Sequence, residues 1–233
     1  MHSSERFRFF ACVLSMALAA VPAWASAPLD HQHPADTEGL EGLTDPPVRS
    51  LVTPYLTAKQ HGARLYFLYD APARVECYDL GAQAWLPMIL LPPGPTAFDI
   101  DAIGLYVAFG QSVYAFETDG TGQRFLRSES DPVQELFAFG SRLLVVEASH
   151  VSSLDVATGA VIDEEDIGWS WRGTSFDGAA IFGRTTSVSP ADILRMGVEL
   201  DGTLGPDDDS PYHGDFPSAT RTFALPGIGA VVD

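Results

Sequence analysis

Short hydrophobic runs alternate with turn residues along most of this chain. Between residues 96 and 130, runs of four or five residues are rich in aromatic and β-branched side chains and stop at turn residues such as Asp119-Gly120. Runs of this length, bounded in this way, are typical of the strands of an antiparallel meander. The strands predicted for this unit are Thr96–Ile100, Leu105–Phe109, Val113–Glu117 and Arg124–Arg127.

Two markers indicate that this unit is repeated. A glycine follows a predicted strand at intervals of 39, 39 and 43 residues, at Gly81, Gly120, Gly159 and Gly202. A phenylalanine recurs at intervals of 39, 39 and 47 residues, at Phe98, Phe137, Phe176 and Phe223. One four-stranded sheet cannot bury both of its faces, so each copy needs a neighbour. A period of about 40 residues therefore predicts an all-β fold, a β-propeller of four-stranded antiparallel blades.

The other hydrophobic runs supply the remaining blades. The first unit contains Leu65–Tyr69, Val75–Tyr78 and Trp85–Leu91, with Leu51–Leu56 as an innermost strand or lead-in. The third contains Val133–Phe139, Leu143–Ala148, Ser152–Val156 and Ala160–Ile167. The fourth contains Thr174–Asp177, Ala179–Arg184 and Ile193–Leu200, and a fifth begins with Thr220–Leu225 and Ile228–Val232. Four to five blades are visible, so we expect residues 51–233 to be a propeller truncated at its C-terminal end. We also expect residues 26–233, expressed alone, to self-associate or remain partly unfolded.

The first 50 residues do not follow this pattern. Arg6 and Arg8 precede the apolar run Phe9–Val21, and Ala23-Trp24-Ala25 places small residues where a signal peptidase reads them. The run is shorter than the ~20 residues of a membrane span. Residues 1–25 are therefore predicted to be a cleaved signal peptide, and the mature protein to be secreted, periplasmic or on the cell surface without membrane insertion. Residues 26–50, acidic and proline-containing, are expected to form a flexible linker.

Charge and cysteine content narrow the range of partners. Residues 1–25 hold one acidic and two basic residues, so the remaining chain carries 30 acidic and 11 basic residues. A surface this acidic repels phosphate backbones and anionic lipids, which argues against nucleic-acid and membrane-surface binding. Cys77 is the only cysteine left after cleavage, so no internal disulfide can form. Its place in the strand Val75–Tyr78 favours a small core residue over a reactive thiol.

Two short motifs resemble known bacterial propellers. Leu105-Tyr106-Val107-Ala108 and Leu154-Asp155-Val156-Ala157-Thr158-Gly159 are similar to repeats of the YVTN-type and quinoprotein-like families. In the second motif an acidic residue closes a hairpin turn, which Gly159 permits because glycine tolerates positive φ. The resemblance covers residues 63–232 at the level of the blade pattern and implies the fold rather than a cofactor.

In propellers, the second-to-third loops and the blade-to-blade connections emerge on one face, which usually carries the site. The predicted blades place Arg74, His150 and Arg184 near second-to-third loops. They place Trp169, Trp171, Arg172 and the insertion 205–217, which includes His213, in blade connections. The two tryptophans share one side of a strand, which would suit stacking on a sugar ring, although large aromatic residues also fill the space between blades.

The insertion is the strongest departure from the period. It holds four aspartates close to His213, namely Asp207, Asp208, Asp209 and Asp215. Clustered aspartates can supply some of the six to eight oxygens of a calcium site, but this spacing is not that of an EF-hand loop, and a solvated acidic loop is the alternative. No other cofactor is expected.

The run Asp163-Glu164-Glu165-Asp166 can be interpreted as paired carboxylates for acid and base catalysis. Successive side chains on a strand point in opposite directions, so at most two of the four face one site. The other interpretation is a charged edge that prevents sheet-to-sheet pairing. No serine or cysteine can be tied to His150 or His213 as a nucleophile, so a hydrolytic triad is not supported.

These observations favour a secreted or periplasmic module that binds a protein, polymer or small-molecule ligand, with no catalytic residues. The alternative is a calcium-assisted propeller enzyme acting on lactones or glycans, supported by the cluster Asp207–Asp215 together with His150 and His213. A fold does not define an activity, so the sequence leaves the ligand open.

Overall fold

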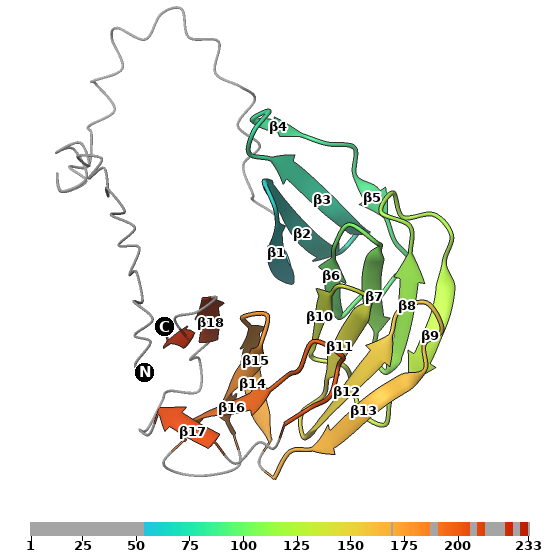
Figure 1. Ribbon diagram of the computed structural model, residues 1–233. Coiled ribbons are helices and arrows are strands. Elements are labelled where there is room, and N and C mark those ends of the chain that lie inside the picture. Colours follow the sequence, from blue (N-terminus) through green and yellow to red (C-terminus); the bar gives the residue numbers. More distant parts are fainter. Residues whose placement is uncertain are drawn as a thin grey trace, which may run out of the picture. The chain divides into compact units, whose positions relative to one another are not determined.

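The computed structural model (Figure 1) describes residues 54–168, 170–186, 191–205, 209–212, 222–225 and 229–232. All of them belong to one structural unit, Pro46–Asp233. Their regular elements are strands, which form five antiparallel sheets. None of these residues lies in a helix with the length and apolar character needed to cross a membrane.

Four of the sheets are blades whose strands follow one another in chain order. Blade 1 is β1 (Thr57–His61), β2 (Arg64–Asp70), β3 (Ala73–Asp79) and β4 (Ala84–Trp85), with β5 (Ile89–Leu90) also paired to β3. Blade 2 is β6 (Ala97–Ile100), β7 (Leu105–Phe109), β8 (Ser112–Phe116) and β9 (Arg124–Ser128). Blade 3 is β10 (Glu135–Phe139), β11 (Arg142–Val146), β12 (His150–Asp155) and β13 (Val161–Asp166). Blade 4 is β14 (Trp171–Phe176), β15 (Ala180–Thr185), β16 (Ile193–Gly197) and β17 (Asp209–Tyr212).

The fifth sheet contains only β18 (Thr222–Leu225) and β19 (Gly229–Val232). It joins blade 4 through Thr222, whose hydroxyl donates to the carbonyl of Gly173 at 2.7 Å and accepts from Ser175 at 2.8 Å. The predicted all-β propeller of four-stranded antiparallel blades is confirmed.

Two strands differ from those expected. The innermost strand of blade 1 is β1, which leaves the lead-in alternative for Leu51–Leu56; its first three residues lie outside the described residues, and the Leu56 N–H bonds to the carbonyl of Leu68 at 2.8 Å. The outer strand of blade 4 is β17, which lies inside the segment interpreted as an insertion. Both differences have one cause: β1 and β17 contain charged and polar residues, so neither shows the hydrophobic run that marks the other strands.

Three hydrophobic clusters, one between each pair of neighbouring blades, form the core. Each strand sends alternate side chains to opposite faces, so blades 2 and 3 are apolar on both. On β7, Leu105 and Val107 pack toward blade 1, while Tyr106 and Ala108 pack toward blade 3. Cys77 is buried in the first cluster.

The phenylalanine marker is not structurally equivalent from blade to blade. Phe98 packs in the cluster between blades 1 and 2, whereas Phe137 packs in the cluster between blades 3 and 4. Phe176 faces back toward blade 3, with its ring centroid 5.8 Å from that of Phe137. Because a one-residue shift in register turns a side chain to the other face of a sheet, equal spacing in sequence does not ensure equal orientation.

The glycine marker falls in the turn between the third and fourth strands of each blade, with positive φ at Gly120, Gly159 and Gly202 but not at Gly81. Gly159 has a φ of +72° in the turn between β12 and β13. It also packs directly against blade 2, because a Cβ at this position would lie 2.6 Å from the Leu126 carbonyl oxygen. The Asp155 carboxylate closes this turn by accepting from Thr158 N–H at 2.9 Å. Asp79, Asp119 and Asp201 accept backbone N–H bonds in the corresponding turns of the other blades.

Candidate functional site

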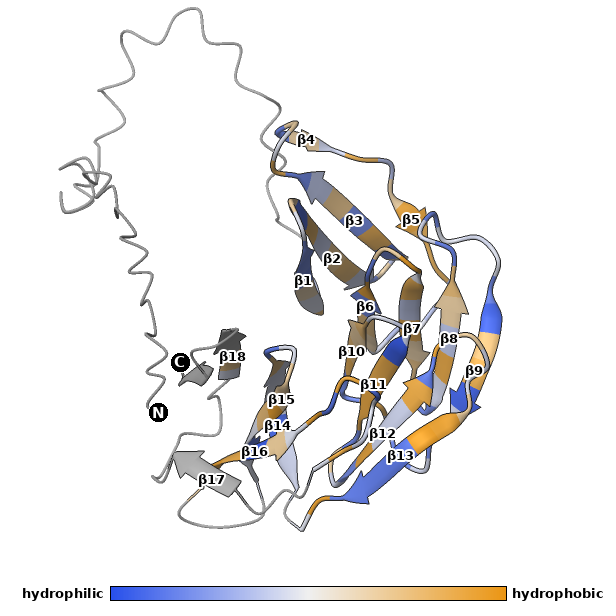
Figure 2. Ribbon diagram, in the orientation of Figure 1, coloured by the Kyte–Doolittle hydropathy of each residue, from blue (hydrophilic) through white to orange (hydrophobic). Residues whose placement is uncertain are grey.

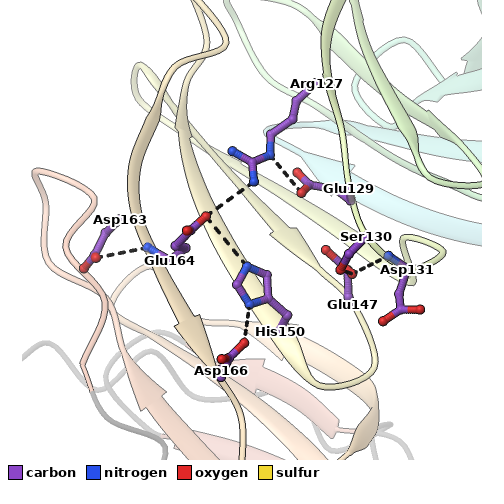
Figure 3. A network of polar contacts seen from close by, with 9 residues as sticks. All are labelled: Arg127, Glu129, Ser130, Asp131, Glu147, His150, Asp163, Glu164 and Asp166. Atoms are coloured by element: carbon purple, nitrogen blue, oxygen red, sulfur yellow. Dashed lines mark hydrogen bonds and ion pairs between the residues drawn. The ribbon is translucent and has the colours of Figure 1, made fainter.

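The predicted functional face gathers polar side chains at one edge of blades 2 and 3 (Figure 3). Three chain segments meet there: the end of β9 with the connection to β10, the loop from β11 to β12, and the end of β13. The antiparallel order of each blade places these strand ends together, because a third strand begins where the second and fourth strands end.

The outer layer of this network is solvent-exposed. His150 Nδ1 lies 2.9 Å from Asp166 Oδ1, and its Nε2 lies 4.0 Å from Glu164 Oε2. Arg127 of blade 2 reaches the same Glu164 oxygen at 3.4 Å. The Asp166 side chain is 95% exposed and that of Glu164 is 53% exposed, so both carboxylates are available to a partner.

The inner layer consists of two buried glutamates. Arg127 Nε donates to Glu129 Oε2 at 2.9 Å, while Ser130 Oγ and Asp131 N–H donate to Glu147 Oε2 at 3.0 and 2.8 Å. The second oxygen of each carboxylate, Oε1 of Glu129 and of Glu147, is buried without a hydrogen-bond partner. An unpaired buried acceptor is costly, so each of these oxygens destabilises the inner layer.

The electrostatics of Glu129 follow from this environment. Burial raises the pKa of the Glu129 carboxyl, Arg127 opposes that shift, and the negative charge of Glu147 adds to it. His150 also acts on Glu129, in the direction that lowers its pKa. The outer and inner layers of the network are therefore electrostatically coupled.

The four consecutive carboxylates of β13 divide between two sides of the strand. Glu164 points to Arg127 and His150. Asp163 Oδ2 instead accepts the backbone N–H of Leu204 in blade 4, at 2.8 Å. This alternation matches the prediction that at most two of the four face one site. The arrangement holds blades together and presents charge, and it brings no nucleophile to the carboxylates.

The three predicted arginines lie apart from this network. Arg74 is tied down by its own blade, with Nε 2.8 Å from Glu76 Oε1 and its guanidinium carbon 4.1 Å from the centroid of the Tyr69 ring. Arg184 donates to the Thr185 carbonyl at 2.8 Å. Arg172 is exposed at the start of β14, directly opposite Arg184 in the sheet register.

Trp171 does not belong to a ligand-facing surface. Its side chain is fully buried in the cluster between blades 3 and 4, and it packs so closely on Gly183 that a Cβ there would lie 2.7 Å from the indole ring. The structure supports the packing interpretation for this residue and contradicts the stacking one, because neither ring face is accessible.

The remaining predicted site residues fall largely outside the described residues. Those are Trp169, Asp207, Asp208, His213 and Asp215. Asp209 begins β17 and lies opposite Arg195 in the register of blade 4. Among the residues that the structure describes, no group of three or more His, Cys, Asp or Glu side chains is arranged to hold a metal ion.

The sequence analysis did not identify a second polar centre on the innermost strands. The Lys59 side chain of blade 1 reaches blade 3. Its Nζ lies 2.9 Å from Glu135 Oε2 and donates to the Leu136 carbonyl oxygen at 3.2 Å. The same Nζ lies 4.3 Å from the centroid of the Phe137 ring. Asp99 of blade 2 accepts the N–H of Ala138 at 2.7 Å. The sequence did contain a feature that marks this residue. Lys59 is the only lysine of the chain, and it lies one repeat period, 39 residues, before Phe98.

Comparison with known proteins supports the fold alone. No protein-family model and no curated protein matches this chain. Among solved structures, the computationally designed Ika8 protein matches 75% of this chain and 56% of its own, at 11% identity and a TM-score of 0.51. A chain of the mitotic checkpoint complex matches 67% of this chain and 52% of its own, at 11% identity and a TM-score of 0.51.

A third solved structure is the WD40 domain of Neurospora crassa Pan2, which matches 63% of this chain and 46% of its own, at 15% identity and a TM-score of 0.48. The chain thus spans about half the length of these three structures. At 11% identity, the two matches with a TM-score of 0.51 show a likeness of fold alone.

Proposed function

We propose that this chain is an exported β-propeller interaction module that binds a protein, polymer or small-molecule partner on the face formed by its second-to-third loops and blade connections. The observation that carries the proposal is the two-layered network of blades 2 and 3. Exposed Asp166 and Glu164 stand over buried Glu129 and Glu147, and Arg127 joins the two layers. Loops held by a rigid sheet are a common location of binding residues.

The chemistry of the network favours binding over catalysis. The accessible groups are two exposed carboxylates together with a partly buried imidazole and a partly buried guanidinium, which form ion pairs and hydrogen bonds with a partner. Their partners in the blade fix their positions, so little conformational entropy is lost when a ligand binds. The calcium-assisted enzyme that acts on lactones or glycans would depend on the segment 205–217, and no contact among the described residues favours it.

Charge reversal on this face tests the proposal. Immobilised protein would be exposed to panels of basic, acidic and neutral peptides and of oligosaccharides, and saturable binding to at least one class is expected. The variant Asp131→Lys reverses the charge of an exposed residue in the connection from β9 to β10, next to the network, and should weaken that binding roughly tenfold.

The matched control is Glu117→Lys, which changes the net charge by the same amount. Glu117 is exposed in the third-to-fourth turn of blade 2, at the opposite end of the blade, and its reversal should leave binding within about twofold of the wild type. Absence of saturable binding to every class, or equal binding by both variants, would contradict the proposal.

Export and kinship with the YVTN-type and quinoprotein-like propellers are part of the same proposal. Their support is the charged and apolar N-terminal segment and the Asp155 to Gly159 turn, whose carboxylate accepts the bonds that the motif implies. Protein recovered from the periplasm or medium of a bacterial host should begin at Ser26. A mature N-terminus at Met1 would rule out the signal peptide.

A further inference from the structure

The outermost strand of blade 3 has an unpaired edge. β13 pairs with β12 from His150–Asp166 to Leu154–Val161, and no described strand pairs with its other edge. Outside this pairing, the described residues form no backbone-to-backbone hydrogen bond with residues 161–166. Such an edge presents backbone N–H and C=O groups that can pair with an additional strand, and of these the Glu164 N–H already donates to Asp163 Oδ1 at 3.0 Å.

The side chains along this edge change character from one end to the other. Val161 and Ile162 are 36% and 37% exposed, so the first part of the strand offers apolar side chains to an approaching partner. The four residues that follow are all acidic, and Asp166 and Glu164 are the most exposed of those that form ion pairs. Figure 2 shows the same change in hydropathy along β13.

Charge complementarity indicates what this edge can bind. The chain as a whole carries a formal charge of −18, so a second copy would be repelled by the carboxylates of β13. Arg127 neutralises part of the charge of Glu164, but Asp166 faces only His150. An approaching strand is therefore favoured only if it supplies cations opposite the second half of β13.

We propose that the free edge of β13 binds an extended cationic segment of a partner protein by strand addition, with basic residues opposite Asp163–Asp166 and apolar residues opposite Val161 and Ile162. This inference rests on the proposed function and names the partner class and the element that receives it. Backbone pairing supplies part of the affinity, and the acidic side chains select the partner.

A synthetic peptide tests the inference on the unmodified protein. The probe has about ten residues, the length of a long strand, with alternating lysine and threonine in its first half and alternating valine and threonine in its second. Its control has the same sequence with alternate backbone nitrogens methylated, which removes the donors needed for strand pairing and keeps every charge. Isothermal titration should show saturable binding of the probe and at least tenfold weaker binding of the methylated control.

Variants then locate the binding site. Glu164→Lys/Asp166→Lys should weaken binding of the probe roughly tenfold, whereas Glu117→Lys/Glu199→Lys, which changes the net charge equally, should stay within about twofold. Equal binding of the methylated peptide, no loss in the β13 variant, or no binding of the probe would overturn the inference. If one of these outcomes is found but Asp131→Lys still weakens binding of a partner identified in the panels, the strand-addition inference fails while the proposed function stands.

Discussion

Glu129 illustrates how burial sets the ionisation of a single residue in this protein. Its carboxylate lies between blades 2 and 3 with one oxygen on Arg127 and the other unpartnered. Burial is the largest influence on its pKa, which is raised above the ordinary value of about 4.3. A raised folded-state pKa means that the stabilisation is complete below the unfolded pKa and is lost as pH rises through the folded value.

The variant Glu129→Gln should therefore lose this pH dependence. We expect the stability of the wild type, measured relative to the variant, to fall as pH rises from about 4 through the raised pKa of the carboxyl. Urea unfolding at a series of pH values measures the difference. Glu164→Gln, which removes an exposed carboxylate of the same network, is the control and should keep the profile of the wild type.

A Glu129→Gln profile identical to that of the wild type would contradict the assignment. The turn carboxylates Asp119 and Asp155 titrate in another window, because hydrogen bonds from Thr121 and Thr158 lower their pKa. Their contribution is present above the ordinary range of aspartate and is lost as pH falls through the lowered values, so it does not obscure the effect of Glu129.

At the scale of the element, the turn between the third and fourth strands is the most consistent part of each blade. In blade 3, the carboxylate of Asp155 satisfies the backbone of the turn, and Gly159 adopts positive φ where the turn meets the preceding blade. Both features act within a few residues of sequence, and the contact with Leu126 makes the turn part of the interface between blades.

Gly159→Ala should destabilise the protein by roughly 2 to 4 kcal/mol, because alanine is strained at this φ and its Cβ would collide with the backbone of Leu126. Gly140→Ala is the matched control in the same blade. Gly140 also has positive φ, +56°, but its Cβ would meet nothing within 4 Å, so only the conformational strain of about 1 kcal/mol is expected. Equal losses in urea unfolding would show that the contact with blade 2 is not significant.

At the scale of the whole molecule, contacts between blades determine how the sheets are held together. Hydrophobic clusters fill each interface, and polar contacts cross it at defined points, such as Asp163 to Leu204 and Asp99 to Ala138. Lys59 spans the greatest separation among them, since it starts in blade 1 and ends on blade 3. Burial raises the pKa of Asp99, and the positive charge of Lys59 opposes that shift.

Replacing Lys59 by methionine should cost about 1 to 2 kcal/mol of unfolding free energy, because Glu135 and Asp99 lose their cation while the aliphatic stem is retained. Lys59→Arg keeps the charge and should cost less. A double-mutant cycle with Glu135→Gln, followed by urea unfolding, should give a coupling energy of about 0.5 to 1.5 kcal/mol. Additive losses would show that the two side chains act independently.

The sequence by itself determined the strands, the four-stranded repeat and the turns. These features depend on alternation along a strand and on hydrogen bonds between residues two or three positions apart, such as those of Asp155. It also placed His150 on the loop-bearing face, since that position follows from the order of strands within one blade. The polar outer strand β17 was not recognised because it lacks a hydrophobic run.

The tertiary structure decided which way side chains face and which distant charges meet. Phe98 and Phe137 share a spacing but pack in different interfaces, and Trp171 is core rather than surface, because register and the neighbouring blade set the environment of each. The buried positions of Glu129 and Glu147 were equally invisible, since no local pattern shows that a carboxylate will be covered by another blade. Contacts across interfaces depend on packing between sheets, and packing is a property of the folded chain.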